Sequence, residues 1–462
     1  MTRSRPGSDD FRRLGALALP VVFVQVGLMA MGVVDTMIVG RLSPTALAGV
    51  AVGNVYAFAV GSFGMGVLMA LDPLVSQAVG AGDRPAIARA LQRGLVIAAA
   101  LSVVATLVLL PVGPVLRALG QPPAMVDVAA PFAHALIPGM AAFFIAVTLR
   151  QTLQAMGRMR PVVIAIVVTN VLNGVLAWAL VFGELGLPRL EGAGAGVATS
   201  VSRWVMALLM LALGWPALRP HLAWRADALR AAPLARMVRI GLPIGLQVEL
   251  EYGVFAAVAL VMGHLGPVPA GAHQIAINIA SLTFMVPLGV ASAASVLVGR
   301  AVGAGLESEA RRAGVAAIAV GAGFMVLSAA ALTLAPGPLA RAYTPDAEVV
   351  ALAALLIPIA GVFQVFDGVQ VVSIGVLRGV GDTRTPLVVN LIGYWVLALP
   401  VALWLAFRAG LGPVGLWWGL VAGLMIVAVV LLARVRARLW RPLARLVVDE
   451  APAAALEGAE PR

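Results

Sequence analysis

The sequence is divided into long apolar segments, and their number and length constrain the fold more than any other feature. A transmembrane helix needs about 20 predominantly apolar residues, and twelve segments of this chain reach that length. They lie at roughly 14–39, 46–71, 91–111, 128–155, 161–183, 193–215, 240–264, 270–299, 313–335, 347–377, 386–408 and 412–433. Only 11% of the residues are charged, whereas soluble domains average about 25%. We therefore predict an all-α membrane protein with twelve transmembrane helices.

Arginine is distributed unevenly between the loops that join these segments. When the loops are numbered alternately from an inside N-terminus, most arginines fall in the inside set. The outside set holds Arg41, Arg117, Arg189, Arg341 and Arg408. Because basic residues concentrate in cytoplasmic loops, we predict an inner (plasma) membrane protein with both termini in the cytoplasm. The net charge of +11 then reflects topology and contact with anionic lipid, and no nucleic acid is needed to explain it.

Residue types needed for several kinds of chemistry are missing or scattered. The chain has no cysteine, which excludes disulfides, thiolate metal sites and thiol catalysis. Its four histidines form no metal-ligand cluster. An intramembrane transferase for prenyl chains would need paired aspartates to hold Mg²⁺, and no DxxxD or DDxxD sequence occurs in a span or loop. We therefore expect no enzyme activity and no cofactor.

An internal repeat divides the chain into two halves. Pro20 and Pro243, and the VGAG sequences at 79–82 and 302–305, recur at one offset of 223 residues. Because this offset spans an even number of helices, the repeats are parallel, a plan that places a transporter's binding site near the membrane midplane between them. We predict two pseudo-symmetric six-helix bundles. The expected bounds are 1–215 for the N-terminal bundle, 216–239 for a basic cytoplasmic linker, 240–436 for the C-terminal bundle and 437–462 for a cytoplasmic tail, basic and then disordered.

Acidic residues lie inside predicted spans, where a charged side chain costs roughly 2.5–3.5 kcal/mol on insertion scales. Glu251 follows Arg239 by twelve residues and Asp367 precedes Arg378 by eleven. At about 1.5 Å per residue, both acids lie about 17–18 Å from the cytoplasmic edge. We therefore predict that Glu251 and Asp367 face one cavity and take up and release H⁺ or Na⁺ together. Asp35, late in the first span and nearer the outside, is a third candidate for the coupling ion.

Further polar and aromatic residues lie in the spans. They could form a substrate or polar network, or they could only bond neighbouring helices, at about 0.6 kcal/mol each on average. The candidates for the network are Asn170, Asn173, Gln247, Gln274, Asn278, Phe284 and Phe363. Two more acids, Glu249 and Asp72, have no assigned role, and we expect the helix to loosen at Pro73, directly after Asp72.

Several segments resemble the multidrug and toxic compound extrusion (MATE) family, NorM-type branch, and the resemblance extends over nearly the whole chain. They include VVDTMIVGRLSPTALAGVAVG (33–53), FGELGLPRLEGAGAGVAT (182–199) and VFDGVQVVSIGVLRGVGDTRTP (365–386). The resemblance implies two bundles around a central cleft, and export of bulky, often cationic and lipophilic compounds by antiport with H⁺ or Na⁺. It also implies that Glu251 and Asp367 match the family's cation site, Asp35 its helix 1 aspartate, and Pro20 the helix 1 proline at which a bend forms.

The chain departs from the family pattern at two places. Phe363 stands one turn before Asp367, where related proteins often carry tyrosine, and the loss of that oxygen favours H⁺ over Na⁺. Ala177 stands four residues after Asn173, where the family often has a second polar residue, and Asn170 is a candidate substitute.

Other functions remain open from the sequence. A lipid-linked oligosaccharide flippase of the same superfamily would be expected to carry a basic cavity for pyrophosphate, whereas the buried charges here are acidic. A pore or a purely structural protein would leave those acids unexplained. We expect a monomer surrounded by membrane lipid that handles small drug-like molecules. Its only bound ion would be the coupling ion, H⁺ or Na⁺, at Glu251 and Asp367.

Overall fold

The computed structural model describes residues 6–449, and every regular element within them is a helix. Twelve spans are long and apolar enough to cross a membrane, when α2 with α3 and α14 with the three elements after it are each counted as one. The predicted number of spans is thereby confirmed. The elements are α1 (Ser8–Val39), α2 (Pro44–Leu68), α3 (Leu71–Gly80), α4 (Arg84–Leu109), α5 (Val112–Ala118), α6 (Pro123–Ala155), α7 (Met159–Phe182), α8 (Glu191–Leu222), η1 (Ala226–Leu229), α9 (Ala231–Leu265), α10 (Pro267–Gly303), α11 (Glu307–Leu334), α12 (Pro336–Arg341), α13 (Ala347–Gly379), α14 (Arg384–Asn390), η2 (Leu391–Ala398), α15 (Leu399–Leu403), η3 (Trp404–Arg408) and α16 (Gly412–Leu439).

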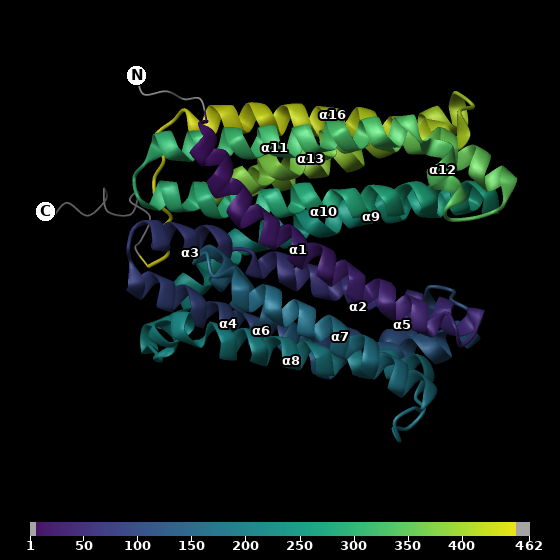
Figure 1. The fold of residues 1–462 in the computed structure, drawn as a ribbon, viewed down its shortest axis with the longest axis horizontal. Helices are drawn as coiled ribbons and strands as arrows, with labels where there is room; N and C mark the ends of the chain where they lie inside the picture. Colours follow the sequence, from purple (N-terminus) through teal and green to yellow (C-terminus); the bar gives the residue numbers. More distant parts are fainter. Residues whose placement is uncertain (1–5, 450–462) are drawn as a thin grey trace, which may run out of the picture.

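The helices form two bundles that lie side by side (Figure 1). The helices from α2 to α8 pack together in the N-terminal bundle, and those from α9 to α16 in the C-terminal bundle. α1 crosses obliquely between them, so that it packs on α7 of the first bundle and on α10 of the second. This arrangement confirms the predicted pair of bundles. We call the end that holds the start of α1, the turns after α3 and α10, and the end of α16 the terminal face (Figure 1).

The predicted domain boundaries fall largely within helices. The segment 216–239 contains the last turns of α8, the short helix η1 and the start of α9. The segment predicted as the tail begins inside α16, which ends at Leu439. The disorder predicted for the tail concerns 449–462, of which 450–462 lie outside the described residues.

Close backbone contacts join the two bundles near the terminal face. Gly80 of α3 lies against the carbonyl of Arg300 in α10, and Gly303 lies against the carbonyl of Gln77, so neither glycine has room for a Cβ. The Gln77 side chain also donates a hydrogen bond of 2.9 Å to the carbonyl of Gly379 in α13. Toward the opposite end the bundles diverge (Figure 1). The molecule is therefore held together most tightly at the terminal face.

Two spans contain interruptions of the regular α-helix. The second span breaks between Leu68 and Leu71, directly before the Asp72–Pro73 pair where the sequence predicts loosening. The eleventh span contains two π-helical segments, η2 and η3. Wider turns of this kind shift the following side chains around the helix axis and occur frequently at functional sites.

The chain after α16 crosses the terminal face as an extended segment, residues 440–449, which we call the strap. It contacts the C-terminal bundle first and the N-terminal bundle afterwards. Its polar contacts, in chain order, are Leu443 with Glu307 (3.1 Å), Arg445 with Asp83 (2.7 Å), Leu446 with Gln77 (2.7 Å) and Asp449 with Arg93 (2.6 Å). The strap therefore joins the two bundles at the face where they already touch.

Candidate functional site

Two carboxylates meet in the C-terminal bundle. Glu251 of α9 is half-buried, and Asp367 of α13 is only 6% exposed. The two groups interact electrostatically. Oδ1 of Asp367 has no hydrogen-bond partner within the described part of the chain. Asp367 therefore keeps one oxygen that can accept a proton or contact a cation, and a shared cavity for the two acids stays a prediction.

Aromatic and amide side chains surround this pair. The Tyr394 hydroxyl, on the π-helical segment η2, donates a hydrogen bond of 2.7 Å to Oε1 of Gln370 and interacts electrostatically with both carboxylates. Phe255 packs against Tyr394, with ring centroids 6.4 Å apart. Our sequence reasoning missed these three residues. Gln370 could have been found, since it follows Asp367 by three residues and shares its helix face. Tyr394 gave no such signal.

Phe363 is placed in the interior of the C-terminal bundle. It is 2% exposed and packs edge-on against Phe255 and Trp417, with centroids 5.9 Å apart in each case. Phe363 was a sequence candidate for the substrate or polar network, and in the structure its ring packs against other aromatic side chains.

A third carboxylate, Asp35, lies near the end of α1 and is held by two donors from the N-terminal bundle. Asn173 donates a hydrogen bond of 2.6 Å to Oδ1, and Thr199 donates one of 3.1 Å to Oδ2. Arg203 of α8 also acts on Asp35 electrostatically. Thr199 and Arg203 were not among the sequence candidates. Asn170 takes no part, because its amide donates to the carbonyl of Ile166 in its own helix.

Glu249 lies at the junction of the two bundles. Ser62 of α2 donates a hydrogen bond of 2.6 Å to Oε1 of Glu249 on α9. Next to this contact, Phe58 of α2 packs edge-on against Tyr252 of α9 at 4.9 Å between centroids. Glu249 therefore faces the other bundle, on a different side of α9 from Glu251, as expected for residues two apart in a helix.

Asp72 forms an ion pair across the two bundles. Its carboxylate is fully buried and lies 3.5 Å from the guanidinium of Arg378 on α13. Arg150 of α6 also acts on Asp72 electrostatically. The partner is 306 positions further along the chain, and nothing in the sequence pointed to it. This pair places a charge contact between the bundles about two turns before Gly80, which packs against α10.

The remaining sequence candidates do not join one cluster. Gln247 is buried in α9, and Phe284 is half-buried in α10. Gln274 donates a hydrogen bond of 3.1 Å to Asn278 in the same helix, at an exposed position. Pro20 lies inside the continuous helix α1, where it removes a backbone hydrogen bond and permits a bend.

The acids are not arranged as a cage for a divalent metal. Among residues 6–449, no three His, Asp or Glu side chains converge on one point. Glu251 and Asp367 offer carboxylate oxygens, and the Tyr394 hydroxyl is bonded to Gln370. This set suits a proton or a single monovalent cation.

Comparison with known proteins places this geometry in context. The family model described as MatE matches residues 20–179 and 243–404, which are corresponding parts of the two halves. The chain is 35% identical to the multidrug resistance protein MdtK of Edwardsiella ictaluri, over 92% of this chain and 95% of that protein. It is 37% identical to the probable multidrug resistance protein NorM of Burkholderia pseudomallei, over 93% and 92%. The crystal structure of the eukaryotic MATE transporter AtDTX14 superposes with a TM-score of 0.84 at 25% identity, covering 93% of this chain and 99% of the other.

Proposed function

The chain belongs to the MatE family, and on that premise we propose that it is a secondary active multidrug efflux transporter. It exports bulky, often cationic and lipophilic compounds by antiport with H⁺ or Na⁺. The names of its relatives support the choice of small drug-like molecules as cargo. The observation that carries the coupling is the buried carboxylate of Asp367, which has one unpartnered oxygen and a second carboxylate beside it.

The coupling ion and the cargo bind in alternation, and the charge of this carboxylate pair determines which of them is held. An ion that arrives from the outer side neutralises one negative charge, so that a cationic drug loses favourable electrostatics and leaves. Release of the ion toward the cytoplasm restores the negative charge and the affinity for the next drug. The membrane potential contributes about 2.3 kcal/mol per 100 mV for each charge that moves inward.

Alternating access requires one bundle to rock against the other. The contacts near the terminal face, including the Asp72–Arg378 ion pair and the Gly80 and Gly303 contacts, have to part when that side opens. The diverging opposite end then closes. Transport therefore involves a state in which the terminal face is open and water reaches these residues.

Replacement of Asp367 tests the assignment of the ion site. We expect Asp367→Asn to abolish ion-driven ethidium efflux from proteoliposomes while the protein still inserts and remains monodisperse. Glu348→Gln is the matched control, since Glu348 is an exposed carboxylate in the first turn of the same helix. Unchanged efflux by the Asn variant would remove Asp367 from the coupling mechanism.

Separate ΔpH and Na⁺ gradients across the same proteoliposomes decide the coupling ion. We propose H⁺, because Phe363 replaces an oxygen ligand with a packed ring and the Tyr394 hydroxyl is engaged by Gln370. Efflux driven by ΔpH in the absence of Na⁺ is the expected result. Efflux that requires Na⁺ and ignores ΔpH would overturn this choice without affecting the family assignment.

The orientation and assembly are part of the same proposal. We place the chain in the inner membrane as a monomer, with the terminal face and both termini in the cytoplasm, because most arginines cluster at that face. The chain has no native cysteine, so a single cysteine at the exposed Ala81 reports the side directly. We expect a membrane-impermeant maleimide to label this cysteine only after the inner membrane has been opened.

A further inference from the structure

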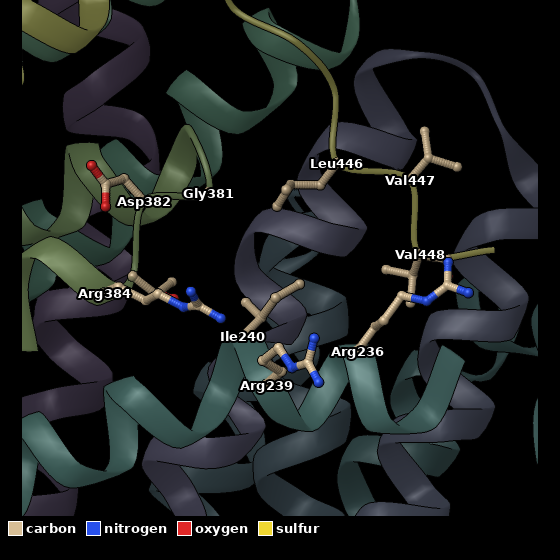
Figure 2. A pocket seen from close by; sticks show the side chains of 10 residues that line it. Arg236, Arg239, Ile240, Gly381, Asp382, Arg384, Leu446, Val447 and Val448 are labelled. Atoms are coloured by element: carbon tan, nitrogen blue, oxygen red, sulfur yellow. The ribbon is translucent and has the colours of Figure 1, made fainter. Parts of the chain in front are cut away.

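A basic cavity of about 280 Å³ lies at the terminal face between α9, the turn after α13 and the strap (Figure 2). Its lining includes Arg236 and Arg239 of α9, Asp382 and Arg384 after α13, and Leu446 and Val448 of the strap. Figure 2 shows Arg384 on one side of Ile240 and Arg239 on the other, with the Arg384 guanidinium directed toward Ile240. The cavity is small for a drug-sized ligand, which occupies roughly 300–1,000 Å³, and it has room for a compact anionic group.

Within residues 6–449, the cavity keeps positive charge on Arg239 and Arg384 that no carboxylate neutralises. Asp382 is the acidic residue of the lining, and its carboxylate accepts hydrogen bonds from Arg434 at 2.8 Å and from Thr385 at 3.1 Å. Its charge is therefore already committed to Arg434, which does not line the cavity. Within the described part of the chain, Arg239 and Arg384 form no ion pair.

Neighbouring arginines of the same face behave differently. Arg89 and Arg93 pair with Asp449, and Arg445 pairs with Asp83. These side chains hold the strap in place. Arg239 and Arg384 thus stand apart as exposed cations that line the same cavity and have no carboxylate partner among residues 6–449.

The cavity also lies where the chain enters the apolar part of the bundle. Arg239 is followed at once by Ile240 and the apolar run of α9, and Ile240 lines the cavity together with Leu446. A site with guanidinium groups on one side and apolar side chains on the other suits an amphiphilic ligand. Basic pockets between helices on the cytoplasmic side of a membrane bind anionic lipid headgroups.

We propose that this cavity binds the phosphate group of an anionic headgroup and that the bound phosphate fastens the strap across the two bundles. Planar guanidinium groups present paired N–H donors that match phosphate oxygens. The phosphate would contact Arg239 and Arg384 directly, and the strap residues Leu446 and Val448 form the adjoining wall. Occupation of the cavity thereby stabilises the closed terminal face.

The turn after α13 is built to receive the strap. Gly381 has a φ of +82°, a conformation that favours glycine. A Cβ at this position would also lie 2.6 Å from Cδ1 of Leu446. The hydrogen bond of 2.8 Å from Arg236 to the carbonyl of Val448 holds the strap from the other side of the cavity. Loss of phosphate is therefore expected to loosen the strap first and the contact between bundles afterwards.

Binding of dioleoylphosphatidylglycerol to the full-length protein in detergent, measured by native mass spectrometry, tests the site. Each arginine near an anionic headgroup contributes about fivefold in binding, so Arg239→Gln/Arg384→Gln should bind this lipid about twenty-five-fold more weakly. Arg219→Gln/Arg441→Gln is the control, because it removes the same charge from two exposed arginines that do not line the cavity. Arg239→Lys/Arg384→Lys should recover part of the affinity.

Three further measurements separate the outcomes. Dioleoylphosphatidylcholine should bind weakly and equally to all variants. If inorganic phosphate competes with the lipid in the micromolar range, the site recognises phosphate of either source. If it does not compete, recognition is specific to the lipid. Both results support the proposal. Equal loss of lipid binding in the cavity variant and the control, or no loss in either, would overturn it. Because binding is read without transport, the result is independent of the efflux assays.

Discussion

The ion pair between Asp72 and Arg378 is the contact whose removal should most change the balance between the two states of the transporter. The two side chains come from different bundles, and their exposed fractions are 0% for Asp72 and 10% for Arg378. Asp72→Asn removes the negative charge and keeps the size of the side chain. Arg378 is then left as a buried cation, with Arg150 as a second cation nearby.

The structure sets the scale of the effect. Breaking a buried ion pair by removing one partner costs about 3–5 kcal/mol. The separation of 3.5 Å is longer than in a strong charge-assisted hydrogen bond, so we take the lower figure of about 3 kcal/mol. The cost applies to the state with a closed terminal face, because water reaches Arg378 once that face opens. A shift of about 3 kcal/mol is roughly a hundredfold, which would raise an open population of about 1% to about half.

Disulfide cross-linking measures this balance, since the chain has no native cysteine. Ala81 and Ala304 are exposed C-caps of α3 and α10, which pack together near the terminal face. We expect Ala81→Cys/Ala304→Cys to cross-link efficiently in the parent chain and much less in the Asp72→Asn background. Glu309→Gln is the control, because it breaks an exposed pair with Arg13 at 3.9 Å, and such pairs contribute about 0–1 kcal/mol.

Charge reversal separates a specific ion pair from general damage. Asp72→Arg/Arg378→Asp should restore cross-linking and efflux, since it rebuilds the pair with opposite polarity. If Asp72→Asn lowers the thermal stability while cross-linking stays at the parent level, the pair serves stability alone and our account of the closed face is wrong. Failure of the reversed pair together with normal insertion would point the same way.

Two further results are expected. Burial alone would raise the pKa of Asp449, but hydrogen bonds and charges from two arginines of α4 outweigh it and lower the pKa below its ordinary value of 3.8. A carboxylate with a depressed pKa stabilises the bound state fully above its free pKa and loses that effect as pH falls through the bound value. A spin label at Ala444→Cys should therefore show a docked strap from about pH 5 to 8 and release only in stronger acid; release near neutral pH would contradict this. Asn173→Ala should slow efflux about tenfold, since a hydrogen bond to a charged group contributes about 1.5–3 kcal/mol, whereas Asn170→Ala should have little effect because its amide bonds its own helix and not Asp35; equal effects would contradict the assignment.

The number of spans and the two bundles could be predicted because they depend on local and repeated features. The length of each apolar segment fixes a helix, and alternate loops fix its direction. The matching VGAG sequences at 79–82 and 302–305 now lie at the ends of α3 and α10, where glycine permits the two helices to touch. The repeat was therefore visible in the sequence because the same close packing is needed twice.

The partners of the acids were harder to predict, because they depend on how helices rotate about their axes. Membrane depth follows from residue counting, and it was enough to predict that Glu251 and Asp367 lie at one level of the C-terminal bundle. Thr199 and Arg378 come from other helices, and no spacing rule connects them to Asp35 and Asp72. Tyr394 lies on a π-helical segment, where the regular 3.6-residue period no longer tells which face a side chain occupies.

The acids of the two bundles have different surroundings, and under the proposed mechanism this difference suits them to different tasks. Both oxygens of Asp35 accept hydrogen bonds from side chains of its own bundle, so an entering ion would have to displace a donor there. Among the described residues, Oδ1 of Asp367 has no hydrogen-bond partner, so an ion can be added there without breaking a hydrogen bond at that oxygen. On the proposed antiport mechanism, this difference favours the C-terminal bundle as the place where the coupling ion is exchanged. The helix α9 carries Glu251, and through Glu249 it also contacts Ser62 of α2 in the other bundle. A change of charge at Glu251 therefore occurs on the same helix that forms part of the contact between the bundles.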